Sequence, residues 1–169
     1  MVHPNIWHRF AHTAPARFIE GHLSRWRKLI SRLPRRLRWP AALPPHLQLG
    51  RKGEAAAERF LKKHSFKILY RNFKARSGGE IDLVCRDRKE RVLVFVEVKT
   101  RTNEVFGTPH EAVNWRKRAT VVRAAKEWLR LLDLPDVPFR FDIVEVVAEP
   151  QPQIRLIRGA FEMEENIYS

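Results

Sequence analysis

The chain has 169 residues, 44% of them hydrophobic, and a formal net charge of +14 at neutral pH, with a sequence pI of about 10.8. This composition excludes a wholly disordered chain, and no apolar run approaches the roughly 20 residues that a transmembrane helix needs. The single cysteine, Cys85, excludes an internal disulfide and a cysteine-based zinc site. No secretory signal pattern is visible, so we expect a cytoplasmic protein.

The positive charge predicts a polyanionic partner, with nucleic acid the first candidate and an anionic membrane surface the second. A basic protein without such a partner would have the same composition. Residues 1–48 hold nine Lys and Arg against one acid, whereas residues 49–169 hold 24 basic and 18 acidic residues. We therefore expect a basic N-terminal arm with a proline-rich linker at 1–48, a folded domain at 49–161 and a C-terminal tail at 162–169.

The N-terminal arm contains one segment with helical periodicity. Between Phe18 and Leu33, apolar residues recur at steps of three and four, Arg25 and Lys28 fall off that stripe, and Pro34 ends it. The pattern predicts a basic amphipathic helix. Three roles remain open for it: lying on anionic lipid, contacting phosphates, or docking to a partner. An arginine-rich, acid-poor arm also resembles an organelle transit peptide.

The domain that follows alternates helical and β-prone segments. The dense apolar run Val92–Val96 is typical of a central strand, and Thr108–Glu111 has the form of a capping box. The pattern predicts an α/β fold with one mixed sheet flanked by helices, in the order α-β-β-β-α-β. The expected helices are 50–64 and 109–132, and the expected strands are 66–75, 79–86, 91–101, 139–147 and a short last one at 154–157.

Two of the acidic residues on the predicted hairpin of the second and third strands are expected to face each other. If Lys89 and Glu90 form a two-residue loop, Asp82 lies directly opposite Glu97, and Lys99 shares a face with Glu97. Like charges directly opposed on a sheet are destabilising. A divalent cation, Mg²⁺ or Mn²⁺, would explain them, because Mg²⁺ is commonly held by one or two carboxylates, water and phosphate oxygens.

Such a site would suit phosphodiester hydrolysis. A metal held by Asp82 and Glu97 could polarise a phosphoryl group and lower the pKa of a bound water. Lys99 could orient the attacking water or offset charge in the transition state. The alternative is an edge hairpin with a solvated polar face, although the third strand is very apolar for an edge.

These segments resemble a known family. The stretches GEIDL (79–83) and VEVK (96–99) are similar to the motif of restriction-endonuclease-like nucleases, which include archaeal Holliday-junction resolvases. About two-thirds of the chain, from Gly50 to about Phe161, resembles the bacterial YraN family; the arm lies outside this resemblance. The matching pieces are Gly50-Arg51-x-Gly53-Glu54, 69–73 (LYRNF), 79–83, 95–101 (FVEVKTR), 106–107, 140–142 (RFD) and 159–161 (GAF).

The resemblance implies a nuclease-like fold, nucleic-acid binding and, in resolvase-like relatives, a homodimer. It also implies a place near the metal for Glu54, which matches a helix glutamate of the resolvases. The open alternative for Glu54 is the general preference for acids in the first turn of a helix. Asp142 matches the family pattern without a clear role.

Several basic residues are candidates for contact with a nucleic-acid backbone. Lys117 lies on the apolar stripe of the second helix, so its ammonium must reach either the site or solvent, and both remain open. We expect Glu58 to pair with Lys62, one helical turn away. The candidates for phosphate contact are Arg71, Arg76, Arg101 and Lys117, while Arg116 and Arg118 are expected on a solvated face, His110 in solvent and Cys85 in the core.

Three functions compete. The first is a Mg²⁺-dependent endonuclease acting on DNA, the second a nucleic-acid-binding module without turnover, and the third a protein docked to a membrane or partner through its arm. The presence of Asp82, Glu97 and Lys99 favours the first.

Overall fold

A computed structural model describes residues 45–102, 114–132, 137–148, 151 and 153–163. The predicted arm helix, the capping box at Thr108 and His110 lie outside these residues. In the part of the chain that is described, no helix is long and apolar enough to cross a membrane.

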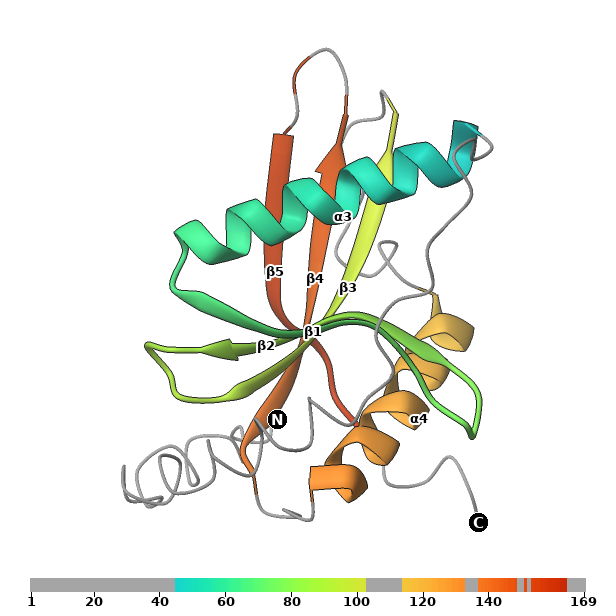
Figure 1. The fold of residues 1–169 in the computed structure, drawn as a ribbon, viewed down its shortest axis with the longest axis vertical. Coiled ribbons are helices and arrows are strands. Elements are labelled where there is room, and N and C mark those ends of the chain that lie inside the picture. Colours follow the sequence, from blue (N-terminus) through green and yellow to red (C-terminus); the bar gives the residue numbers. More distant parts are fainter. Residues whose placement is uncertain (1–44, 103–113, 133–136, 149–150, 152, 164–169) are drawn as a thin grey trace, which may run out of the picture.

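The architecture confirms the predicted mixed α/β fold (Figure 1). Five strands form one sheet in the order β1-β2-β3-β4-β5, with β3 and β4 parallel and the other neighbours antiparallel. The elements are α3 (Pro45–Lys63), β1 (Phe66–Lys74), β2 (Glu80–Asp87), β3 (Leu93–Arg101), α4 (Trp115–Leu132), β4 (Phe139–Val147) and β5 (Gln153–Phe161).

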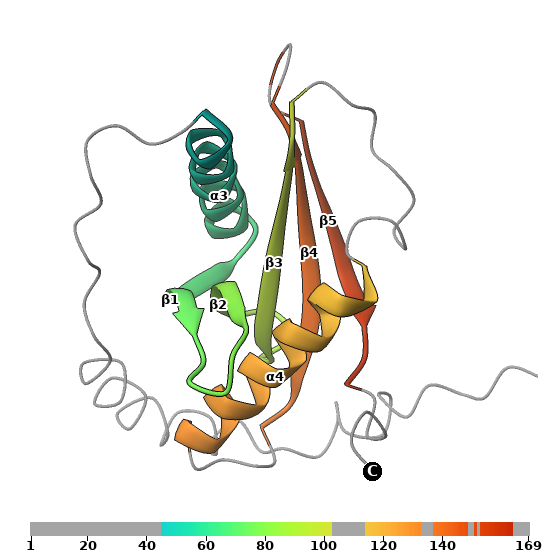
Figure 2. The same cartoon turned by 90° about the vertical axis from the view of Figure 1, so that its right-hand side faces the viewer.

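The two helices cover opposite faces of the sheet, as the edge-on view of Figure 2 shows. On one face α3 packs Ala57 and Leu61 against Val94 and Val96 of β3. On the other face α4 packs residues such as Trp128 against the opposite side of the sheet. Because β3 is buried on both faces, its apolar run is continuous, which is the usual pattern for a central strand next to a parallel neighbour.

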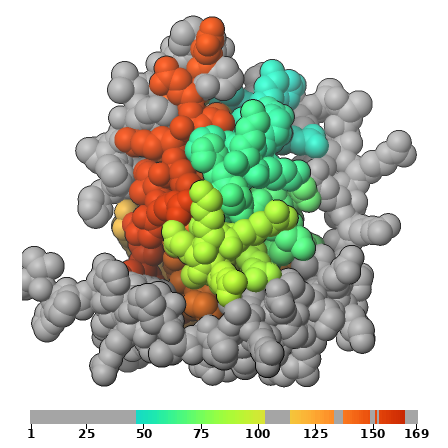
Figure 3. Space-filling view, turned by 90° about the vertical axis from the view of Figure 1, so that its left-hand side faces the viewer, coloured from blue at the N-terminus to red at the C-terminus, as the bar shows by residue number. Residues whose placement is uncertain are grey.

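The helix α3 begins five residues earlier than predicted, at Pro45. Proline suits the first turn of a helix, because its fixed φ is helical and its missing N–H would have no partner there. The predicted boundary between residues 48 and 49 therefore falls inside α3. Figure 3 shows the surface of α3 adjoining those of β5 and β2.

The start of α4 also differs from the prediction. The helix begins at Trp115, and Asn114 caps it by accepting the N–H of Lys117 on its side-chain oxygen at 2.9 Å. Asparagine is a strong N-cap because its side chain satisfies a donor that the first turn leaves free. The expected start at Thr108 is therefore wrong for this helix.

Five residues, 88–92, lie between β2 and β3, and the Asp87–Val92 hydrogen bond closes a turn of four residues, 88–91, instead of the predicted two. Asp87 donates its N–H to Val92 O at 3.0 Å, and Arg91 adopts a positive φ of 60°. The longer loop extends the predicted one by one residue on each side, so the pairing register stays the same. Leu83 pairs with Val96, as expected.

The last strand continues to Phe161, beyond the predicted end at Ile157. Gly159 has a φ of +56° and donates its N–H to Asp142 at 3.0 Å, and the β4–β5 register shifts at this point. A glycine with positive φ can form a bulge without ending the ladder. Pairing resumes where Phe141 faces Phe161.

Candidate functional site

The two predicted acids lie where β2 and β3 separate. The last pair in the β2–β3 ladder is Leu83 with Val96, and the next residues are Asp82 and Glu97. Beyond this point β3 stays paired with β4 as far as Arg101, whereas β1 and β2 run across the direction of β3–β5 (Figure 1). The structure therefore brings Asp82 and Glu97 together, in the predicted register.

Asp82 takes the place of a ladder partner for β3. Its Oδ2 accepts the backbone N–H of Val98 at 2.7 Å. The side-chain alternation of β2 breaks here, because Ile81 and Val84 both belong to the core on the α4 face although they are three residues apart. Asp82 lies at this break, and its side chain reaches the backbone of β3.

Both acids are largely removed from water. Burial raises the pKa of Asp82 to about 6. Burial, and then the charge of Asp82, raises the pKa of Glu97 to about 8. Glu97 is 6% exposed, and its Oε2 is buried with no hydrogen-bond partner among the described residues. A buried acceptor without a partner costs free energy, and a ligand that contacted this oxygen would remove that cost.

The cation nearest to Glu97 comes from α4. The Nζ of Lys117 lies 3.1 Å from Glu97 Oε1 and 3.7 Å from Glu80 Oε1. Burial opposes the charge of Lys117, but the carboxylates of Glu97 and Asp82 outweigh it and raise the lysine pKa. Of the two positions left open for the Lys117 ammonium, at the site or in solvent, the structure shows the first, beside Glu97.

Glu54 approaches the same acids from α3. Its Oε2 accepts a hydrogen bond of 2.9 Å from Asn72, and its charge contributes to the raised pKa of Asp82. Gly53 makes this approach possible, because a Cβ at position 53 would lie 1.8 Å from Thr100 Oγ1 of β3. Asn72 lies on the neighbouring strand β1, within the stretch 69–73 that resembles the family, but it was not among the predicted site residues.

Lys99 lies two residues after Glu97 on β3 and is exposed. Its register partner on β4 is Glu145, which accepts a hydrogen bond of 2.7 Å from Arg155 Nε. The other oxygen of Glu145 is buried with no hydrogen-bond partner in the described part of the chain. A row of charged residues therefore crosses β3, β4 and β5 next to the acid pair, and Glu145 was not among the predicted site residues.

The other predicted phosphate contacts do not gather at one point. Arg71 donates to Glu58 with Nε at 2.7 Å from Oε2, and Glu58 also pairs with Lys62 at 2.6 Å, which confirms the predicted helix pair. Arg76 is exposed in the β1–β2 turn, where Glu127 accepts its backbone N–H. Arg101 is half-buried at the end of β3.

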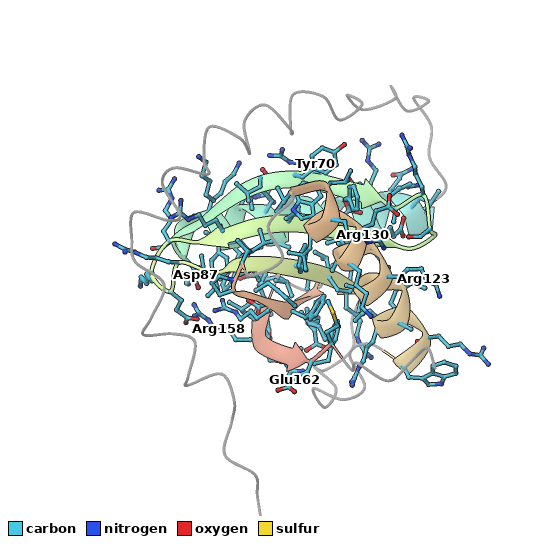
Figure 4. All side chains as sticks on the ribbon, turned by 90° about the horizontal axis from the view of Figure 1, so that it is seen from below. Tyr70, Asp87, Arg123, Arg130, Arg158 and Glu162 are labelled. Carbon is cyan, nitrogen blue, oxygen red and sulfur yellow. The ribbon has the colours of Figure 1, made fainter. Side chains whose placement is uncertain are left out.

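Asp142, whose role the sequence left open, belongs to a separate ion network. It is fully buried, and its Oδ1 accepts a hydrogen bond of 2.8 Å from Nε of Arg140. Nη2 of the same arginine lies 2.9 Å from Asp87 Oδ2. Arg158 approaches Asp87 at 3.4 Å and Glu90 at 2.5 Å, and Figure 4 shows it beside Asp87. This network joins the β2–β3 turn to β4 and β5, so its role is structural.

The acid pair fits a small divalent cation. Mg²⁺ needs only one or two protein carboxylates when water and phosphate oxygens complete its shell. Asp82 and Glu97 supply two, including the buried oxygen that lacks a partner. Within the residues that the structure describes, no group of three or more His, Cys, Asp and Glu side chains is arranged to hold a metal ion.

Comparison with known proteins identifies relatives of this chain. Residues 53–146 match the model of the uncharacterised protein family UPF0102. A UPF0102 protein of Geobacter metallireducens is 47% identical over 116 residues, which cover 68% of this chain and 93% of the relative. One of Symbiobacterium thermophilum is 45% identical over 116 residues, covering 68% and 96%. The family match begins after the arm, at the glycine that packs α3 onto β3.

Proposed function

The chain belongs to the UPF0102 family, the YraN family that its motifs resemble, and we propose that it is a nucleic-acid-binding protein with a Mg²⁺-dependent endonuclease centre acting on DNA. The observation that carries the proposal is the pair of half-buried Asp82 and buried Glu97, in which one oxygen of Glu97 has no partner among the described residues. Two opposed acids in a central hairpin cost stability, and a bound cation would offset that cost.

Each residue of the site has a definite part in this proposal. Asp82 and Glu97 would hold the cation, with Asp82 kept in place by its hydrogen bond to Val98. When bound, the metal supplies Lewis-acid polarisation of the phosphoryl group and a more acidic water. Lys99, exposed beside the pair, would orient the attacking water and offset negative charge on the phosphate. Glu54 would add negative charge from the α3 side.

The surface of α4 supports a nucleic-acid substrate. Its residues include six Lys and Arg, with Glu127 as the only acid. At its first turn Trp115 is 73% exposed, and the guanidinium of Arg116 lies 5.3 Å from the centre of its ring. Basic residues interleaved with an exposed aromatic ring suit phosphates and bases together. Lys117, from the same turn, links this helix to the acid pair.

The direct test is cleavage of a DNA panel containing linear, flapped and four-way substrates, with Mg²⁺, Mn²⁺ or EDTA. We expect metal-dependent cleavage by the wild type and its loss in Asp82→Asn and Glu97→Gln, which keep the shape of each side chain. Lys62→Met, at an exposed helix position paired with Glu58, is the matched control and should cleave normally. Equal cleavage by wild type and both site variants would refute the proposal.

A second candidate is a nucleic-acid-binding module without turnover. The ion pair between Lys117 and Glu97 favours it, because an ammonium already neutralises part of the acid pair. This candidate predicts salt-sensitive DNA binding, no cleavage with either metal, and DNA affinity that is unchanged in Asp82→Asn.

A further inference from the structure

We propose that Lys117 is a resident counter-cation of the acid pair, and that a divalent cation binds by displacing its ammonium from Glu97 toward Glu80. This inference rests on the proposed function, because it takes the metal site as real. It assigns to Lys117 a control over metal binding, in place of the simple phosphate contact that its sequence position indicated.

The first step is the position of the ammonium. Nζ of Lys117 is 3.1 Å from Glu97 Oε1, on the carboxylate whose other oxygen is buried without a partner among the described residues. The Lys117 side chain is only 32% exposed, so the pair is partly shielded from water. A cation in such a position supplies the charge that the two acids need when no metal is present.

The second step is that the ammonium and a metal exclude each other. Both would need the oxygens of Glu97, and two cations a few ångströms apart repel strongly where water is scarce. A lysine can turn away from such a position about the several bonds of its four-carbon stem, so the main cost of displacement is the broken ion pair. The metal-free and metal-bound states would then differ in the place of one side chain.

The third step is that a second position is already present. Glu80 Oε1 lies 3.7 Å from the same Nζ, and the Glu80 side chain is 49% exposed. Glu80 stands at the start of β2, two residues before Asp82, so the ammonium can move toward solvent without leaving the acidic surroundings. Lys74 approaches the other oxygen of Glu80 at 3.9 Å, which leaves Oε1 facing Lys117.

The fourth step concerns the backbone of Lys117, which is held at the start of α4. Asn114 accepts the backbone N–H of Lys117, and Thr120 donates its hydroxyl to the Lys117 carbonyl at 2.8 Å. The main chain of Lys117 is therefore anchored at the start of α4, and its side chain is held by the ion pairs with Glu97 and Glu80 alone among the contacts described above. Displacement consequently needs no movement of the helix.

The experiment is calorimetric titration of Mg²⁺ into the full chain without DNA, in a buffer more alkaline than the Glu97 pKa of about 8 so that protons compete little. Lys117→Met removes the ammonium and keeps the apolar stem. We expect it to bind Mg²⁺ about tenfold to a hundredfold more tightly than wild type, since a hydrogen bond to a charged group must no longer be broken. Arg116→Met, which removes the neighbouring charge, should change the affinity less than about twofold.

Glu80→Gln tests the second position, alone and combined with Lys117→Met, or with Lys117→Gln if Lys117→Met does not fold. Without the Glu80 charge the displaced ammonium has a poorer acceptor, so the loss of Mg²⁺ affinity should be several-fold when Lys117 is present and smaller when it is replaced. An equal loss in both backgrounds would show that Glu80 acts only through its own charge and would overturn the second position. In thermal melts without metal, Lys117→Met should melt lower than wild type, and its Mg²⁺-induced rise in melting temperature should be larger.

The outcomes separate this inference from the proposed function. If wild type binds Mg²⁺ and Lys117→Met binds it no more tightly, displacement is wrong and the metal site stands. If Arg116→Met strengthens binding as much as Lys117→Met, only general charge matters and the inference fails. If Lys117→Met binds and wild type does not, displacement is supported while the metal-dependent activity of the wild type is refuted. If neither binds Mg²⁺ or Mn²⁺, both fail.

Discussion

The carboxylate of Asp82 accepts the backbone N–H of Val98 across 2.7 Å, at the point where β2 and β3 stop pairing with each other. The bond replaces a missing ladder contact and keeps the acid next to β3. Because Val98 directly follows Glu97, this bond also sets how close the two carboxylates come. The packing and hydrogen bonds of the folded domain therefore hold two carboxylates close together, although like charges opposed on a sheet repel each other.

We expect the metal-free protein to lose stability as the pH rises from about 4 to about 8. Asp82 has a pKa of about 6 and Glu97 of about 8 in the folded chain, both raised mainly by burial. Their contribution to stability is therefore complete below the unfolded pKa values of about 4 and is lost as the pH rises through the folded values. The free energy of unfolding should fall by several kcal/mol, since each tenfold difference in proton affinity between the folded and unfolded states corresponds to about 1.4 kcal/mol.

Urea unfolding in EDTA across this pH range measures the effect. Glu97→Gln, which carries no titrating group, should give a flatter curve and a more stable protein at the alkaline end. The lowered pKa of Glu58, about 2, makes stability rise with pH only up to about 5, so the fall caused by the acid pair is read above that pH. A wild-type stability that rises between pH values of about 5 and 8 would contradict the raised pKa values.

Mg²⁺ should raise the melting temperature of the wild type, because it binds the folded state and not the unfolded chain. Asp82→Asn and Glu97→Gln should abolish the rise. Lys99→Ala should keep it, since lysine is no ligand of Mg²⁺, while any DNA cleavage should be lost. Differential scanning calorimetry with and without Mg²⁺, beside a cleavage assay, makes this comparison; a Lys99→Ala protein that cleaves normally would remove Lys99 from the mechanism.

Deleting the arm should weaken DNA binding and reduce its dependence on salt. Residues 1–48 carry a net charge of +8, and each phosphate that they neutralise releases counterions. Because α3 begins at Pro45, the deletion should end at residue 43, so that the helix keeps its first turn. Binding curves at several salt concentrations give the slope, and an unchanged slope would show that the arm does not contact phosphate.

Gly53→Ala should destabilise the domain by about 1–2 kcal/mol. The added Cβ would lie 1.8 Å from Thr100 Oγ1, so α3 would have to move from β3, and this overpacking outweighs the better helix propensity of alanine. Gly50→Ala, in the same helix, is the matched control. A Cβ there meets nothing within 4 Å, so this change should stabilise by about 0.5–1 kcal/mol. Urea unfolding of both variants measures the two changes in the free energy of unfolding, which should have opposite signs.

Arg140→Met should destabilise the protein by about 3–5 kcal/mol, because it leaves the buried acids Asp87 and Asp142 without their shared partner. Arg158→Met should cost less than about 1 kcal/mol, since the Arg158 side chain is 42% exposed. Adding Asp142→Asn to Arg140→Met should restore part of the loss. Equal effects of the two arginine variants would mean that burial does not determine the strength of this network.

The order and type of the described elements could be predicted from the sequence because they depend on local periodicity. Alternating side chains revealed the strands, and the acids at 82 and 97 could be placed opposite each other from the hairpin alone. The register survived a wrong loop length, because the four-residue loop extends the predicted one equally on both strands. Boundaries were less predictable: the starts of α3 and α4 depend on capping by particular residues.

The surroundings of the acid pair depend on how the helices dock. The pairing of Lys117 with Glu97, the approach of Glu54 and Asn72, and the network around Arg140 join residues far apart in the chain. Periodicity placed Lys117 on an apolar stripe but could not say which carboxylate its ammonium would meet. The sequence by itself determined a hairpin with two opposed acids. Only the tertiary structure decided which cation balances them, because the close contact of Gly53 with Thr100 and the packing of α4 set the helices on the sheet.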